Sequence, residues 1–247
     1  MKKIKSSFLI VLLLAVLSTA LYALQLIIFR SPRDTGFYVL QDFAFLPLQV
    51  AIVSVVLGRY LKNSEKTARL EKLNMVINAF FSEAGTQLLL KLSEFDKNCE
   101  DICPNLDVQF DWKDRDFTKA VKYLENFDLV VDCDAKGLDT LKELLIEKRE
   151  FLLRMIENPN LLEHDSFTDM LLAVFHITEE LIARDEFVDE NRADMLHLAN
   201  DIKRALKTLL VQWVEHLRHL RTEYPYLYSL EVRRNPFIKG KSIRIEG

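Results

Sequence analysis

The sequence predicts an all-α protein, in which an N-terminal transmembrane helical hairpin precedes a cytoplasmic bundle of four to five helices. Two observations carry this prediction. Two long apolar runs, 8–29 and 37–57, lie close to the N-terminus. After residue 58 the apolar residues recur every three or four positions, which is the period of an amphipathic helix.

The first apolar run, 8–29, contains no charged residue. About 20 residues of helix are needed to cross the hydrocarbon core of a bilayer. The run is therefore long enough to span a membrane. A cleaved signal peptide is the alternative, because Ser18 and Ala20 resemble the small residues of a cleavage site. The apolar run continues beyond Ala20 to Phe29, which favours a retained helix.

The second apolar run, 37–57, is less uniform, because it contains Gln41, Asp42, Pro47 and Gln49. A carboxylate near the middle of a bilayer costs about 2.5–3.5 kcal/mol. We therefore expect Asp42 to lie near the outer boundary, where Arg30 or Arg33 pairs with it. The polar segment 30–36 then forms the turn between the two spans.

Basic residues near the ends of the spans predict the orientation, because cytoplasmic flanks are enriched in lysine and arginine. The basic residues are Lys2, Lys3 and Lys5 before the first span, Arg30 and Arg33 in the turn, and Arg59, Lys62, Lys66, Arg69 and Lys72 after the second. We expect both termini in the cytoplasm of a prokaryotic cell, with the bilayer as a partner of the hairpin.

The segment 59–231 is predicted to form the helical bundle, separate from the hairpin over 1–58. Four apolar stripes at helical spacing define its longer expected helices, joined by short loops, and a short helix is expected over Phe117 to Phe127. Stacking these stripes against one another buries them as a bundle. Their apolar positions are Leu70, Leu73, Ile77, Phe80, Phe81, Ala84, Leu88, Leu92 and Phe95; Leu138, Leu141, Leu145, Leu152 and Met155; Phe167, Leu171, Val174, Thr178 and Leu181; and Leu196, Ala199, Ile202, Leu206, Leu209, Trp213, Leu217 and Leu220.

Two features complete this organisation. The segment 232–247 is rich in arginine and lysine, and we expect an extended tail there. No clear helix breaker separates the second span from the first bundle helix, so one helix is expected to run from the bilayer into the bundle.

Charge is distributed unevenly along the chain. The net charge is −4, of which the hairpin region 1–58 contributes +3 and the remainder −7. A protein that grips nucleic acid needs a basic face, so an acidic domain argues against that role. Cys99, Cys103 and Cys133 have no metal-site spacing, and we expect them to be reduced thiols.

The histidines are the first candidates for chemistry. His176 precedes Glu180 by four residues, and His216 precedes His219 by three, so each pair shares one face of a helix. Helical bundles build di-metal centres from Glu-x-x-His units, and the sequence contains none. We therefore assign no catalytic, cofactor or metal-binding residue. A metal or redox site formed by His176, Glu180, His216 and His219 remains an alternative.

Two segments, ENPNLLEHDSFTDMLLAVFHITEEL and LRTEYPYLYSLEVRRNPF, resemble recurring blocks in an uncharacterised family of prokaryotic two-span membrane proteins. The resemblance covers most of the chain. It implies a membrane hairpin with a helical cytoplasmic domain, and it transfers no catalytic residue.

These observations favour a non-enzymatic interaction or signalling module, held at the membrane and bound to a protein partner or to further copies of the chain. Two alternatives stay open. One is the metal or redox bundle described above. The other is a subunit of a small transporter or channel, suggested by Asp42 and Gln49 in the second span.

Overall fold

The computed structural model describes residues 2–159, 161, 165–189 and 191–238, with the side chains of 2–11 and 63–70 left out. Its contacts divide the chain into an N-terminal unit, Met1–Lys66, and a C-terminal unit, Thr67–Gly247. The described residues form helices and no strand, apart from one isolated bridge between Asp96 and Val131. The predicted all-α class is confirmed.

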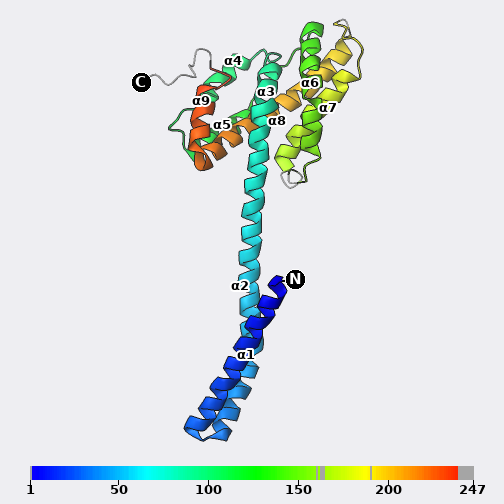
Figure 1. Ribbon diagram of the computed structural model, residues 1–247. Coiled ribbons are helices and arrows are strands. Elements are labelled where there is room, and N and C mark those ends of the chain that lie inside the picture. Colours follow the sequence, from blue (N-terminus) through cyan, green and yellow to red (C-terminus); the bar gives the residue numbers. More distant parts are fainter. Residues whose placement is uncertain (1, 160, 162–164, 190, 239–247) are drawn as a thin grey trace. The chain divides into compact units, whose positions relative to one another are not determined.

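The N-terminal unit consists of helix α1, Lys2–Phe29, and the first part of helix α2, Pro32–Phe80. Within this unit the two helices run side by side (Figure 1). The turn between them is shorter than the predicted segment 30–36, because Pro32 already begins α2. Arg30 adopts a left-handed backbone conformation with φ of 47°. Ser31 then donates a hydrogen bond to Asp34 at 2.5 Å in the first turn of α2.

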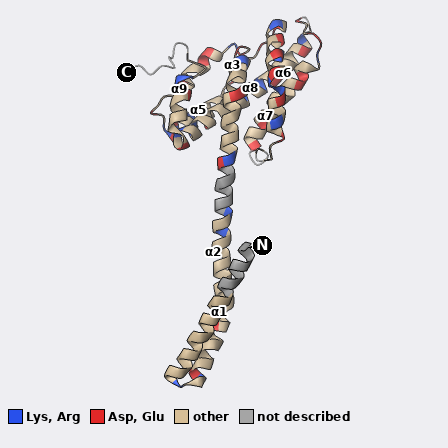
Figure 2. Cartoon of the chain, in the orientation of Figure 1, with Lys and Arg blue, Asp and Glu red and all other residues tan. Residues whose placement is uncertain are grey.

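The described side chains of the N-terminal unit, 12–62, are mostly apolar, and none of them is buried. Figure 2 shows few residues coloured as charged along the described parts of α1 and the first part of α2, whereas α6 and α7 carry many. Two segments are long and apolar enough to cross a membrane, Leu12–Phe29 with a mean hydropathy of 2.3 and Pro32–Lys62 with 1.8.

The C-terminal unit begins with the last part of α2. A π-helical turn, η1 (Phe81–Gly85), joins α2 to helix α3 (Thr86–Ser93). The hydroxyl of Thr86 donates a hydrogen bond to the carbonyl oxygen of Phe81 at 2.9 Å. This bond gives the carbonyl a side-chain partner at the point where α-helical hydrogen bonding changes to π-helical.

The remaining elements follow in chain order. They are α4 (Cys99–Ile102), η2 (Cys103–Asn105), α5 (Asp114–Asn126), α6 (Ala135–Ile156), α7 (Asp165–Ile182), α8 (Arg192–Glu223) and α9 (Pro225–Arg233).

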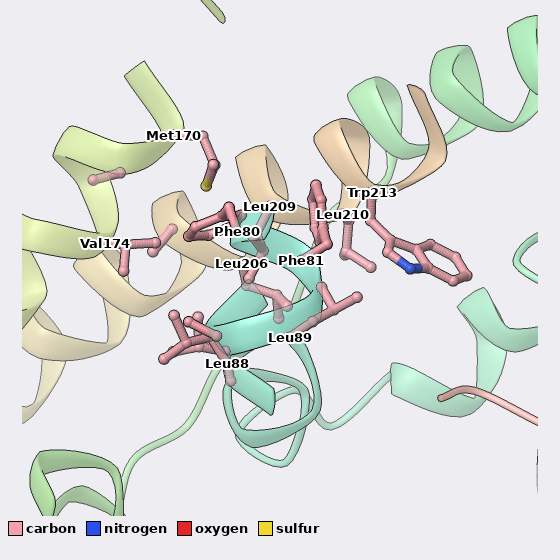
Figure 3. Close-up of a cluster of buried hydrophobic side chains, with 14 of the residues drawn as sticks. Phe80, Phe81, Leu88, Leu89, Met170, Val174, Leu206, Leu209, Leu210 and Trp213 are labelled. Atoms are coloured by element: carbon pink, nitrogen blue, oxygen red, sulfur yellow. The ribbon is translucent and has the colours of Figure 1, made fainter. Parts of the chain in front are cut away.

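Helix α8 is the centre of the C-terminal unit, because α3, α5, α7 and α9 all pack against it. Its side chains Leu206, Leu209, Leu210 and Trp213 meet Phe80 and Phe81 in a buried apolar cluster, with Leu88, Leu89, Met170 and Val174 around them (Figure 3). Phe80 also stacks edge-on against Phe167 of α7, with their ring centres 5.4 Å apart. Burial of these large side chains stabilises the bundle by about 1.5–3 kcal/mol each.

The predicted stripes describe this core well, with one exception, and the side chain of Leu70 lies outside the described part of the chain. Every apolar position predicted for α6 and α7 is buried. On α8, Leu196 was predicted to face the core, but 65% of its surface is exposed. Met195 and Leu198 occupy the buried positions instead, because they lie on the side of the first turn that faces the bundle.

The predicted extended tail, 232–247, packs against the bundle in its described part. Val232 belongs to α9 and is buried. The Asn235 amide donates to the carbonyl oxygen of Leu106 at 2.6 Å, and the Phe237 ring lies edge-on to Trp213. These apolar and amide side chains hold 232–238 on the surface of the bundle. Residues 239–247 lie outside the described part of the chain.

Candidate functional site

Two short histidine–carboxylate motifs meet where α7 packs against α8. Helix α7 carries His176 and Glu180, and α8 carries His197 and Asp201. In each helix the histidine precedes the carboxylate by four residues, so both side chains project from one helical face. We call these four residues the His–carboxylate cluster.

The four side chains approach one another through their nitrogen and oxygen atoms. The Nε2 atoms of His176 and His197 lie 3.3 and 3.4 Å from the same oxygen, Oδ2 of Asp201. His197 Nε2 is also 3.5 Å from Oε2 of Glu180, and His176 Nε2 is 3.9 Å from Oε1 of Glu180. Each histidine therefore lies between the two carboxylates, and the contact between His176 and Glu180 is the longest of the four.

Asp201 is the buried member of the cluster. Only 4% of its surface is exposed, and its Oδ2 atom accepts no hydrogen bond from the described residues. The two imidazole rings are each about half exposed. The cluster therefore has an acidic floor and an open, histidine-lined rim.

Arginines surround the cluster and fix its carboxylates. Arg184 donates to Glu180 Oε2 at 2.7 Å and bonds both carboxylate oxygens of Asp194, at 2.7 and 3.0 Å. These bonds from Arg184 lower the pKa of Glu180 and of Asp194, so both carboxyl groups stay ionised. Arg204 lies 3.5 Å from Oδ1 of Asp201.

A second polar feature is a cavity of about 450 Å³ beside α5, α7 and α8. His216 and His219 both line it, together with Glu125, Gln212 and Glu215. The His216 ring stacks on Phe81, with ring centres 4.8 Å apart. Burial, and to a lesser degree the charge of His219, lowers the pKa of His216 to about 3. His216 is therefore neutral near pH 7.

The four residues of the sequence hypothesis do not come together. His176 and Glu180 meet, as their spacing predicted, but His216 and His219 lie elsewhere. Asp201 and His216 are 15 residues apart on the continuous helix α8, which separates them by about 22 Å at helical rise. The partners of His176 and Glu180 are instead His197 and Asp201. The repeated His-x-x-x-carboxylate spacing on consecutive helices is the sequence signal that identifies them.

The cysteines are thiols without disulfide bonds. Burial raises the pKa of Cys99 to about 11 and that of Cys133 to about 12. Both groups are therefore protonated near neutral pH. Because the thiolate is the nucleophilic form of cysteine, both are poor nucleophiles at that pH.

Asp42 has another partner than the arginines that the sequence suggested. Its carboxylate accepts a hydrogen bond from the Tyr22 hydroxyl of α1, and among the described residues it forms no ion pair with Arg30 or Arg33. A phenol reaches Asp42 from the neighbouring helix, whereas both arginines lie at the turn. Asp42 thus has a polar partner within the hairpin.

Most of the chain matches known sequences. Residues 69–233 match the family model described as the C-terminal helical domain of uncharacterized protein MJ1433, and residues 2–61 match its N-terminal helical domain. The uncharacterized protein MJ1433 of Methanocaldococcus jannaschii is 42% identical over 237 residues, which cover 96% of this chain and 95% of the relative. No solved structure matches the chain.

Proposed function

Because the chain belongs to the family of uncharacterized protein MJ1433, whose two helical domains it contains, we propose that it is an integral membrane protein carrying a non-enzymatic interaction domain. The predicted membership of an uncharacterised family is confirmed. In this proposal α1 and the first part of α2 cross a membrane, and the C-terminal unit lies in the cytoplasm.

The exposure of the N-terminal unit carries the proposal. An apolar helix in the core of a soluble protein is mostly buried, whereas none of the described side chains over 12–62 is. Contiguous exposed apolar surface of this extent is unfavourable in water and indicates a membrane or a protein partner. Backbone groups in a bilayer must be satisfied internally, and helices meet that requirement.

The polar residues of the hairpin fit the same environment. The Tyr22 hydroxyl bonds to Asp42 across the two helices, which lowers the cost of placing a carboxyl group within the spans. Pro47 lies inside α2 without ending it. In a transporter or channel, Gln49 and Asp42 would have to line a pathway for ions or solutes across the membrane. The bond from Tyr22 gives Asp42 a role within the hairpin instead.

The interaction role rests on the C-terminal unit. It has a packed core, and its half-buried thiols Cys99 and Cys133 are poor nucleophiles. The partner in this proposal is another protein or a second copy of the chain.

Topology is the first test. We expect a cytoplasmic reporter, such as green fluorescent protein, to be active when fused after Gly247. A periplasmic reporter, such as alkaline phosphatase, should be active when inserted after Ser31, in the turn between α1 and α2. Membrane fractions washed with alkaline carbonate should retain both fusions.

Release of the chain by carbonate would contradict membrane insertion. Activity of the Gly247 fusion only outside the cytoplasm would contradict the orientation. Crosslinking in intact membranes then tests the interaction role, since a chain that crosslinks neither to itself nor to another protein acts alone.

A further inference from the structure

The His–carboxylate cluster has the composition of a metal site. Imidazole nitrogens and carboxylate oxygens are common ligands of divalent first-row transition metals, and two of each are present. The four donors come from two helices that pack against each other over a shared core. Rigid elements of this kind hold donors more precisely than loops do.

The spacing of the donors fits a tetrahedral ion. Zinc bonds of about 2.0–2.1 Å to nitrogen and oxygen separate neighbouring ligand atoms by about 3.3 Å. The two histidine nitrogens lie 3.3 and 3.4 Å from Asp201 Oδ2, and His197 lies 3.5 Å from Glu180. These three separations exceed those of good hydrogen bonds and are close to the edge length of a coordination tetrahedron.

Asp201 supplies an independent observation. Its Oδ2 atom is buried, accepts no hydrogen bond from the described residues, and faces both imidazole nitrogens. A buried carboxylate oxygen that accepts no hydrogen bond is costly. A cation held between this oxygen and the two imidazoles would satisfy it.

The arginines provide the support that metal ligands usually have. Ligating carboxylates are themselves hydrogen-bonded by neighbouring groups, which fixes their orientation. Arg184 bonds Glu180, and Arg204 lies 3.5 Å from Oδ1 of Asp201, so Oδ2 faces the two histidines. The exposed rim formed by His176 and His197 gives an ion a path from solvent.

The site is not closed as the side chains stand, because no group of three or more His, Cys, Asp and Glu side chains in the described residues is arranged to hold an ion. The longest of the four contacts, 3.9 Å between His176 and Glu180, shows where it is open. Small rotations of the His176 and Glu180 side chains toward each other would shorten this contact.

We propose that His176, Glu180, His197 and Asp201 bind one divalent transition-metal ion, with zinc as the best fit. The proposal does not depend on the membrane role, since all four ligands belong to the C-terminal unit. It replaces the set suggested by the sequence, keeping His176 and Glu180 and exchanging the distant His216 and His219 for His197 and Asp201.

The test uses the full chain in detergent, without a histidine tag and stripped with a chelator. A titration with Zn²⁺ monitored by isothermal titration calorimetry should show one ion bound per chain. Co²⁺ should then give the intense visible absorption of a tetrahedral centre, without the near-ultraviolet band of a cobalt–thiolate bond. The missing thiolate band would show that the ion is bound by the His–carboxylate cluster and not by the three cysteines.

Asp201→Asn and His197→Gln should each weaken zinc binding by more than about 100-fold, since loss of an outer-shell partner alone costs 10–100-fold. His197 is half exposed, so its variant keeps the fold even if the Asp201 variant does not. His219→Gln, on the same helix, is the matched control and should bind zinc like the wild type. Circular dichroism reports the helical content of each variant.

Two results would overturn the proposal. One is a wild-type chain that binds less than one ion per chain across the titration. The other is a folded His197→Gln variant that binds zinc as tightly as the His219→Gln control.

Discussion

His216 illustrates how burial can make a histidine sensitive to acid. Its ring is 4% exposed and stacks on Phe81, and burial lowers its pKa from 6.5 to about 3. Between these two pH values the unfolded chain binds a proton at this position and the folded chain does not. Unfolding therefore takes up a proton, and stability falls as the pH drops below 6.5.

The expected loss from His216 is about 2–3 kcal/mol in the unfolding free energy between pH 6.5 and pH 4.5. His216→Leu removes the titrating group, so its unfolding midpoint should depend less on pH over this range than that of the wild type. Thermal unfolding followed by circular dichroism measures both. Leu196→Ala, at an exposed position of the same helix, should keep the wild-type dependence. Equal pH dependence in wild type and His216→Leu would contradict the assignment.

The sequence predicted part of the residue-scale chemistry. The four-residue spacing of His176 and Glu180 placed them on one helical face, and they do meet. The same four-residue spacing recurs in His197 and Asp201, but the spacing alone does not show that the two pairs meet, because that contact depends on the register of α7 against α8. His216 and His219 share a face as predicted, but helical rise carries them far from the cluster.

At the scale of single elements, the junction between α2 and α3 is tightly packed. A Cβ atom on Gly85 would lie 2.6 Å from Phe80 Cε1 and 2.7 Å from Phe81 Cδ1. Both rings are buried, and they are held by Phe167 and by His216 respectively. Neither ring has free space to move away, so only glycine fits in this π-helical turn.

Gly85→Ala is therefore expected to destabilise the C-terminal unit by roughly 1–3 kcal/mol, the usual cost of overpacking a core. Chemical unfolding of the full chain in detergent, followed by tryptophan fluorescence, measures this change. Gly58→Ala adds the same methyl group where nothing lies within 4 Å and should leave the transition unchanged. A Gly85→Ala variant as stable as the wild type would show that the rings can yield.

The helices themselves were largely predictable, and their irregularities were not. Periodic apolar residues identified α6, α7 and α8, because each of these helices buries one continuous stripe. The π-helical turn at Phe81–Gly85 leaves that periodicity almost unchanged, so the sequence showed only one long helix. Pro32 begins α2 earlier than expected, since proline suits the first turn of a helix.

At the scale of the whole molecule, the two units differ in whether they bury their apolar side chains. The buried core cluster extends from Leu73 to Phe237 and lies entirely within the C-terminal unit. The described side chains of the N-terminal unit have no buried core of their own. The sequence predicted this contrast from its two patterns, an uninterrupted apolar run and a helical period.

A fragment covering 67–247 should therefore fold in water without detergent, because it keeps every member of that core. We expect a helical circular-dichroism spectrum and one cooperative thermal transition, since a packed single core unfolds in one step. The complementary fragment 1–66 should stay in solution only with detergent or lipid, since its apolar side chains remain exposed. Aggregation of the 67–247 fragment, or a transition without cooperativity, would show that the bundle depends on the hairpin for its stability.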